Sequence, residues 1–266
     1  MKLADEQLDH LIETACLAAD KARTITTHWF RADIEVDAKE DRTPVTIADQ
    51  QTELAIREII LERHPEHGFF GEETGIMDSD SEWQWVIDPI DGTKCFATGM
   101  PTFGTLISLI HNQEPVIGLI DHPILDERWI GVSGRPTTHN GLSCSTRSNN
   151  TLSSATVYTT TTDMFNEQNW KVADRFTRSC KFRVFGGDCY SYGLLASGFN
   201  DMVCEADLKP YDFFALVPVV TGAGGCITDW QGNKLTLDSF GEVLASANPT
   251  LHQQAIKALN PPSTSS

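Results

Sequence analysis

The stretch WQWVIDPIDGTKCFATGMPTF, residues 83–103, constrains the fold more than any other part of this sequence. Its first residues are aromatic and apolar, which is typical of a short buried strand. Pro89 and Gly92 predict that the strand then ends in a tight turn, because both residue types interrupt regular structure. Asp88 and Asp91 would therefore lie at the carboxyl end of this strand.

Asp88 and Asp91 are close enough in the chain for their carboxylates to converge on one point. Their mutual repulsion would be costly without a cation between them. Magnesium takes oxygen ligands in near-octahedral geometry, so the Ile90 carbonyl could supply a third ligand. The alternative interpretation is a structural Asp-Pro turn with a capping aspartate.

More carboxylates stand where strands are expected to end or helices to begin. They are Asp49 in VTIAD, Glu72 and Glu73 in GEE, and Glu205 and Asp212 on either side of DLKPY. Asp49 lies near the start of an amphipathic helix predicted at 47–63. For Asp49 and Asp212 the alternative is a helix-capping role, which is worth about 1 kcal/mol.

The combination of VTIAD, GEE, DPIDGT and a distal aspartate before a helix resembles the magnesium-dependent, lithium-sensitive inositol-monophosphatase-like family. The resemblance covers residues 8–259. It implies a mixed α/β (α+β) fold with layers in the order αβαβα, the sugar-phosphatase fold. It also implies two or three Mg²⁺ ions per site, a small phosphate monoester as substrate and a homodimer.

The resemblance also implies a role for each matching residue. Glu72, Asp88 and the Ile90 carbonyl resemble the ligands of a first magnesium, and Asp88, Asp91 and Asp212 those of a second. Thr93, hydrogen-bonded toward Asp49, resembles with it the pair that orients and deprotonates the attacking water. The backbone amides of Gly92 and Thr93 would hold phosphate oxygens. Lys39 matches a loop lysine near the metals, and Glu73 is a turn residue or a third-metal contact.

Residues beside these motifs bear on the substrate. Inositol-specific members carry Thr-Asn after DGT, where this chain has Lys94 and Cys95, and the lysine also occurs in bisphosphate nucleotidases. The stretches GMPTFGTLISLI, IDHPILDERWIGVSG and FGGDCYSYGLLASGFNDMVCEADLKPYDFFALVPVVTGAGG are together most similar to the histidinol-phosphatase branch. Cys95 departs from that branch, where serine is commoner, which leaves its role open.

Histidinol phosphate carries an ammonium and an imidazole, so carboxylates beyond the metal ligands would suit it. Asp188 and Glu205 are the candidates, although Asp188 could be only a turn residue after two glycines. Inositol 1-phosphate and adenosine 3',5'-bisphosphate remain alternative substrates. A catalytically inactive member that binds and regulates a partner is the alternative from another class.

A formal net charge of −17 argues against nucleic acid or an anionic membrane as partner, since both require a basic surface. Seven cysteines without a CxxC pair indicate reduced thiols. We see neither a signal peptide nor a membrane-spanning stretch, and we expect a cytoplasmic protein.

The order of predicted elements suggests two packed subdomains, 1–145 and 146–260, followed by a disordered tail at 261–266. Helices at 8–25 and 47–63 and an antiparallel meander at 105–110, 116–120 and 127–132 belong to the first. The Gly- and Ser-rich segment 133–153 is the predicted connection. Strands and helices alternate after it, and one helix is expected from 212 to about 222. The glycine-rich residues 222–225 fit the end of that helix better than a phosphate-binding loop.

Overall fold

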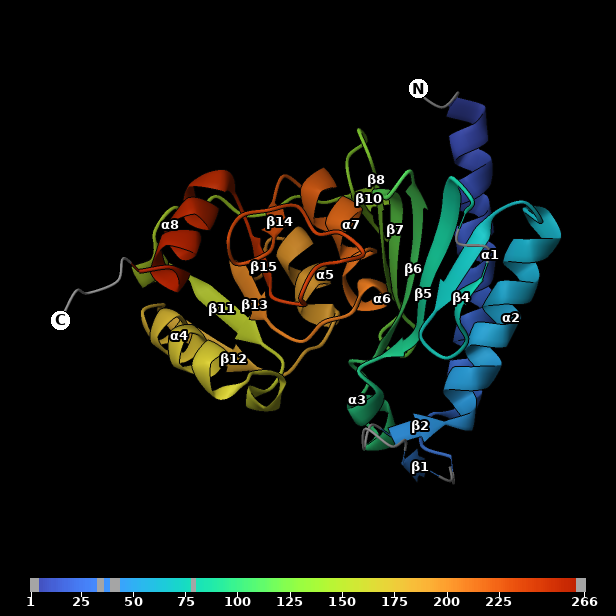
Figure 1. The fold of residues 1–266 in the computed structure, drawn as a ribbon, viewed down its shortest axis with the longest axis horizontal. Coiled ribbons are helices and arrows are strands. Elements are labelled where there is room, and N and C mark those ends of the chain that lie inside the picture. The colour runs from blue at the N-terminus through green and yellow to red at the C-terminus, as the bar shows by residue number, and fades with distance from the viewer. Residues whose placement is uncertain (1–4, 33–35, 39–43, 78–79, 262–266) are drawn as a thin grey trace.

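The structure is a computed structural model that describes residues 5–32, 36–38, 44–77 and 80–261. Its elements stack in five layers, as the sequence predicts (Figure 1). Helices form the outer and middle layers: α1 (Asp5–Trp29) and α2 (Ile47–Arg63) on one side, α5 (Tyr190–Ala196), α6 (Pro210–Phe213) and α7 (Leu216–Gly222) in the middle, and α4 (Glu167–Arg178) and α8 (Pro249–Leu259) on the other side. The predicted αβαβα order is thereby confirmed.

The first sheet has eight strands in the order β10-β9-β8-β7-β6-β5-β3-β4. They are β3 (Gly68–Gly71), β4 (Gly75–Met77), β5 (Trp83–Asp91), β6 (Gly104–His111), β7 (Glu114–His122), β8 (Glu127–Val132), β9 (Thr138–His139) and β10 (Leu142–Ser143). Strands β6 to β8 form the predicted antiparallel meander, and β5 extends it by pairing antiparallel with β6. Strand β3 instead runs parallel to β5. The segments that follow β3 and β5 therefore meet at one edge of the sheet.

Strand β5 differs from its prediction, because it runs for nine residues and includes Pro89. Its pairing with β6 is irregular between Asp88 and Asp91, which marks a bulge. A bulge accommodates proline because one residue there is left out of the ladder. The Pro89 carbonyl still accepts a hydrogen bond, from the Thr105 hydroxyl at 2.8 Å. The prediction that Pro89 ends the strand was wrong.

The second sheet has five strands in the order β12-β11-β13-β15-β14. They are β11 (Thr156–Thr159), β12 (Phe182–Phe185), β13 (Met202–Glu205), β14 (Cys226–Thr228) and β15 (Val243–Ser246). Helices cover both faces, as the alternating pattern predicts. The remaining elements are short: β1 (Val36–Ala38), β2 (Pro44–Thr46), α3 (Thr93–Ala97) and the 3₁₀ turns η1 (Leu152–Ser154) and η2 (Thr162–Met164).

Two further expectations need correction. Residues 133–153 are not only a connection, since β9 and β10 extend the first sheet. The single helix expected at 212–222 is divided into α6 and α7, and α6 begins at Pro210 because proline suits the first turn of a helix. Gly224, with φ +96°, follows the end of α7, so the glycine-rich stretch does terminate a helix. The division into subdomains at residue 145 stays a prediction.

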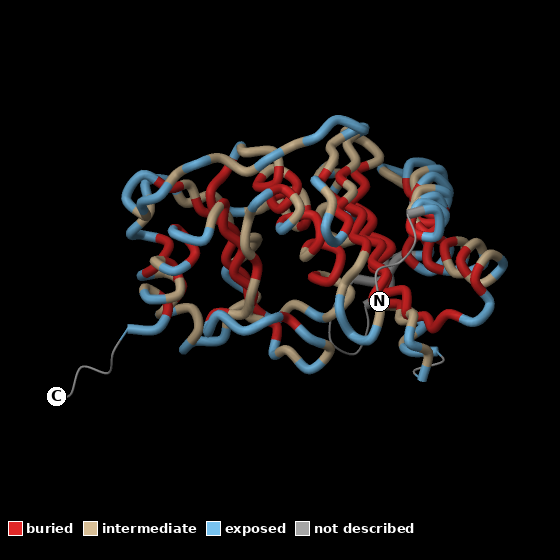
Figure 2. The backbone as a smooth tube through the Cα atoms, turned by 90° about the horizontal axis from the view of Figure 1, so that it is seen from above, coloured by how far each residue is buried: buried red, intermediate tan, exposed pale blue. Residues whose placement is uncertain are grey.

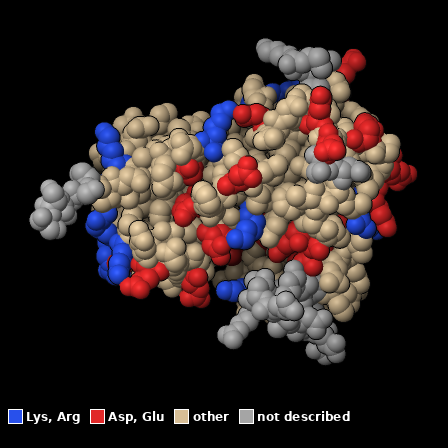
Figure 3. Space-filling model, viewed as in Figure 1, with Lys and Arg blue, Asp and Glu red and all other residues tan. Residues whose placement is uncertain are grey.

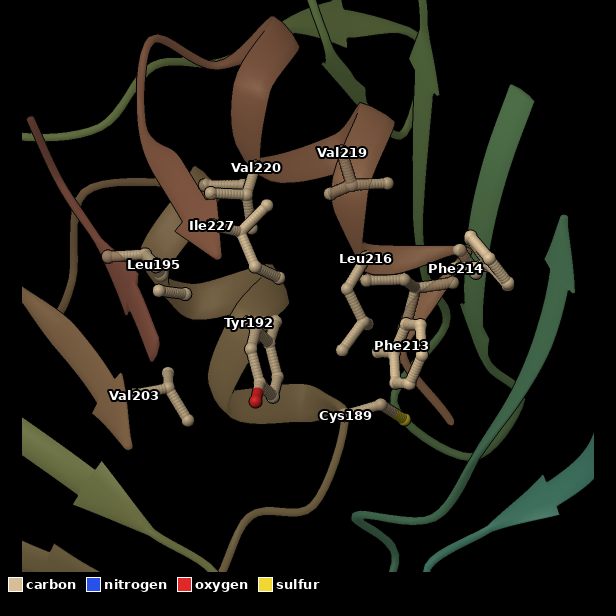
Figure 4. Packing of buried hydrophobic residues seen from close by; sticks show 14 of the residues in the cluster. Cys189, Tyr192, Leu195, Val203, Phe213, Phe214, Leu216, Val219, Val220 and Ile227 are labelled. Atoms are coloured by element: carbon tan, nitrogen blue, oxygen red, sulfur yellow. The ribbon is translucent and has the colours of Figure 1, made fainter. Parts of the chain in front are cut away.

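Buried residues follow the strands and the helix faces that pack on them (Figure 2). The middle layer contributes the largest apolar cluster, in which Tyr192 and Leu216 lie among side chains from α6, α7 and β13 (Figure 4). Two glycines bring α7 unusually close to the first sheet. A Cβ on Gly118 would lie 2.0 Å from the Ala215 carbonyl oxygen, and one on Gly131 would lie 2.2 Å from the Pro218 carbonyl carbon.

Candidate active site

Three of the predicted metal ligands converge. Asp88 and Asp91 come from the end of β5, and Asp212 comes from α6 in the middle layer. Each offers a carboxylate oxygen within 4.8 Å of the others. Asp88 is 2% exposed, so its charge has little access to water. The site is therefore assembled between the first sheet and the helices that cover it.

The acids act strongly on one another. Burial raises the pKa of Asp88 well above its ordinary value, and the charges of Glu72, Asp91, Asp212 and Asp49 raise it further. Burial also raises the pKa of Asp212 to about 7. These carboxylates can all be ionised only beside positive charge. Because the donor set is entirely oxygen, it fits a hard divalent cation.

Neither Asp49 nor Asp212 is only a helix cap. Asp49 lies inside the first turn of α2 and is 2% exposed, and its charge reaches Asp88. The Asp212 carboxylate accepts a hydrogen bond from the Lys209 amide at 2.6 Å, so it does cap α6. Its other contacts belong to the acidic cluster. Asp212 is thus both a helix cap and a member of the acidic cluster.

The turn after β5 is held by its own hydrogen bonds. The Ile90 amide donates to Asp88 Oδ1 at 3.0 Å, and the Thr93 hydroxyl donates to the Ile90 carbonyl at 3.1 Å. Gly92 precedes α3 with φ +80°, a conformation that glycine adopts readily. The hydrogen bond expected between Thr93 and Asp49 and the phosphate contacts of the two amides stay predictions.

Asp188 joins the site from the segment before α5. Its charge raises the pKa of Asp91, after burial, and its carboxylate lies 3.0 Å from the position a Cβ on Gly92 would take. The Cys95 thiol donates to Asp188 Oδ2 at 3.0 Å, which gives this cysteine a definite structural role. The next amide, that of Cys189, donates to Asp91 Oδ2 at 2.7 Å. The exposed Lys94 lowers the pKa of Asp188, against the larger effect of burial.

A cavity of about 70 Å³ opens beside the cluster. Its acidic lining comes from Asp91, Asp188, Glu205 and Asp212. Glu205 is 2% exposed and accepts hydrogen bonds from the Thr160 amide and hydroxyl and, at 2.8 Å, from the Tyr192 hydroxyl. Burial raises the pKa of Glu205 to about 7. Every predicted substrate-side acid therefore lies on this cavity.

Four residues that hydrogen-bond to these acids or to the turn after Glu72 were not predicted from the sequence: Glu53, Thr160, Cys189 and Tyr192. Thr160 stands at a strand end without a recognisable motif, whereas Cys189 and Tyr192 lie in the stretch FGGDCYSYG, whose similarity to the histidinol-phosphatase branch does not reveal their contacts. Glu53 did have a signal, since it follows Asp49 by four residues and so shares a face of α2. Lys39 lies outside the described residues. The Glu73 amide donates to Glu53, as expected of a turn residue.

The DERW segment supports the site through α5. The Tyr190 hydroxyl donates to Glu127 Oε2 at 2.6 Å, and the Trp129 indole donates to Ser197 Oγ at 2.8 Å. These bonds hold both ends of α5 on strand β8. Asp188 and Cys189 immediately precede that helix, so β8 helps to place them.

A second group with metal-ligand side chains, His64, Glu66 and His67, lies at the opposite end of β3. Its geometry argues against a metal. The Trp85 indole N–H donates to His67 Nδ1 at 3.1 Å, so the neutral ring carries its proton on Nε2. Neither nitrogen of His67 then has a lone pair to offer. Within the described residues the acidic cluster is the better metal site.

The chain matches the model of the inositol monophosphatase family over residues 7–262. It is 45% identical to the bifunctional phosphatase IMPL2, chloroplastic, of Arabidopsis thaliana, an alignment that covers 97% of this chain and 77% of the relative. It is 33% identical to a histidinol-phosphatase of Chlorobaculum parvum, with 93% and 96% covered. The solved structure of an inositol monophosphatase from Zymomonas mobilis superposes with a TM-score of 0.88 at 42% identity, with 97% and 99% covered. Fold, acidic cluster and sequence agree, and the chain belongs to the inositol monophosphatase family of phosphatases.

Proposed function

We propose that this phosphatase is a magnesium-dependent histidinol-phosphate phosphatase, which converts histidinol phosphate and water into histidinol and phosphate. The observation that carries the proposal is the acidic lining of the cavity. Asp188 and Glu205 lie there in addition to the candidate metal ligands. Carboxylates suit an ammonium or imidazolium group, whereas an inositol ring needs neutral hydrogen-bonding partners.

Glu72, Asp88, Asp91, Asp212 and the Ile90 carbonyl would hold two or three Mg²⁺ ions. When bound, Mg²⁺ supplies positive charge that activates water and stabilises the phosphoryl oxygens. Asp49 would accept the proton of the attacking water, and the Thr93 hydroxyl would orient that water. The Gly92 and Thr93 amides would bind phosphate oxygens.

The relatives support the proposal in part. One is a bifunctional phosphatase and one a histidinol-phosphatase, whereas the similar solved structure is an inositol monophosphatase. That likeness favours inositol 1-phosphate as a second candidate. Adenosine 3',5'-bisphosphate and a non-catalytic binding role are the remaining alternatives. We expect a cytoplasmic homodimer inhibited by lithium.

Phosphate release from the three esters, side by side, tests the proposal. We expect histidinol phosphate to be preferred by orders of magnitude and a chelator to abolish turnover. Preference for another ester would refute the substrate assignment and leave the metal site standing. If no ester is hydrolysed, the binding role becomes the better hypothesis.

The variant Asp188→Asn tests recognition separately from chemistry. It should raise the KM for histidinol phosphate about tenfold or more and leave hydrolysis of p-nitrophenyl phosphate nearly unchanged, since that ester has no cationic group. Asp163→Asn, an exposed aspartate, is the matched control. An equal loss on both esters would contradict a recognition role for Asp188.

A further inference from the structure

Glu53 is a buried carboxylate that supports the turn carrying Glu72. Its side chain is 0% exposed and lies in α2, one helical turn after Asp49. The four-residue spacing puts both side chains on one face of the helix. Asp49 extends that face toward the acidic cluster, and Glu53 extends it toward the connection between β3 and β4.

The Glu53 carboxylate accepts three hydrogen bonds from two consecutive residues. Oε2 accepts from the Glu73 amide at 2.7 Å, and Oε1 accepts from the Thr74 amide at 2.9 Å and the Thr74 hydroxyl at 2.6 Å. Charge-assisted bonds of this length are among the stronger ones in proteins. Together they fix the backbone immediately after Glu72.

Gly71 closes the other side of the same turn. A Cβ at Gly71 would lie 2.4 Å from the carboxyl carbon of Glu53, so any larger residue would displace that carboxylate. The backbone on both sides of Glu72 therefore lies against the Glu53 side chain. Glu72 in turn is the largest charge acting on Asp88.

We infer that Glu53 is a positioning residue, which directs the Glu72 carboxylate toward Asp88 and so sets the affinity of the site for Mg²⁺. The inference rests on the proposed magnesium-dependent function. Groups that orient metal ligands without touching the metal typically change metal affinity or activity by about 10–100-fold when they are removed. A purely structural role for Glu53 would lower thermal stability and leave the affinity for Mg²⁺ unchanged.

The experiment compares wild type with Glu53→Gln. The amide keeps the size of the side chain. It replaces one carboxylate oxygen by an N–H₂ group, which cannot accept the hydrogen bond that a backbone amide donates to that oxygen. Mg²⁺ is titrated calorimetrically into the metal-stripped proteins, and thermal unfolding is recorded on the same samples. Glu58→Gln, the same substitution at an exposed position of α2, is the matched control.

We expect the Kd for Mg²⁺ to rise about 10–100-fold in Glu53→Gln and to stay at the wild-type value in Glu58→Gln. Raising the Mg²⁺ concentration should restore most of the turnover, while the KM for the phosphate ester changes little. Thr74→Val, which removes only one hydroxyl bond, should raise the Kd severalfold. The Kd of Thr74→Val tests the inference if Glu53→Gln does not fold.

A folded Glu53→Gln protein with the wild-type Kd for Mg²⁺ would overturn the inference, and so would an unchanged Thr74→Val if the first variant is unfolded. Either result would leave the proposed function intact. A wild-type protein that binds no Mg²⁺ would instead overturn the proposed function, and this inference with it. The two failures are therefore distinguishable on the wild-type sample alone.

Discussion

Asp212 should destabilise the metal-free protein above about pH 7. Its pKa rises from 3.8 to about 7 in the fold, first because of burial and then because of neighbouring acids such as Glu72. For a raised pKa the favourable contribution is complete below about 3.8 and is lost as the pH rises toward 7. Above pH 7 the buried charge therefore opposes folding.

The magnitude follows from the shift. At about 1.4 kcal/mol per pKa unit, the ionised side chain costs up to roughly 4 kcal/mol, an upper value because Asp212 is partly exposed. Asp212→Asn removes that charge and keeps a carbonyl oxygen for the Lys209 amide. At roughly 2–4 °C per kcal/mol, the Tm of the metal-free variant at pH 8 should rise by up to about 10 °C.

Thermal unfolding with a chelator at pH 8 and pH 5.5 is the assay, and the gain should shrink at the lower pH. Asp238→Asn, an exposed aspartate, gives the effect of net charge alone. Saturating Mg²⁺ should offset the gain, because a ligand at 1,000 times its Kd adds about 4.1 kcal/mol to the wild type and not to the variant. A variant no more stable than wild type at pH 8 would refute the reasoning.

Two more predictions concern the same cluster. Cys95→Ser should keep kcat/KM within about twofold because a hydroxyl can also donate to Asp188. Cys95→Ala should lower kcat/KM about tenfold because it removes the donor. Equal kcat/KM values in the two variants would show that this hydrogen bond is dispensable. The Kd for Mg²⁺, measured calorimetrically from pH 8 to pH 5.5, should rise as the pH falls below about 7, because protons compete for Asp212; a constant Kd would exclude Asp212 as a ligand.

The convergence of Asp88 and Asp91 could be predicted from the sequence because both carboxylates stand in one short motif. GEE and DPIDGT lie at the carboxyl ends of β3 and β5, and the parallel pairing of these two strands brings their ends together. Asp212, on α6, could be assigned only through the family resemblance, and Asp188, before α5, only from the charge expected of the substrate, because both lie far from β3 and β5 in the chain. No local pattern states which helices of the middle layer meet which strand.

The hydrogen bonds that hold the carboxylates of the site and the turn after Glu72 could not be predicted. The three hydrogen bonds of Glu53 and those of Glu205 depend on backbone groups whose positions only the fold defines. The length of β5 was misjudged for a similar reason. Pro89 ends an isolated strand, but here a bulge and the Thr105 hydroxyl compensate for it.

Gly118 and Gly131 have a consequence for how the chain can be divided. Through them the backbone of α7 lies directly on β7 and β8, although α7 belongs to the second half of the sequence. A protein ending at residue 145 would keep all eight strands of the first sheet. It would lose the middle-layer helices α5, α6 and α7, which cover one face of that sheet. Its apolar side chains, Leu106 and Ile120 among them, would face solvent. Truncation at that point should therefore yield a fragment that aggregates. The two halves of the sequence should be soluble only when they are produced together.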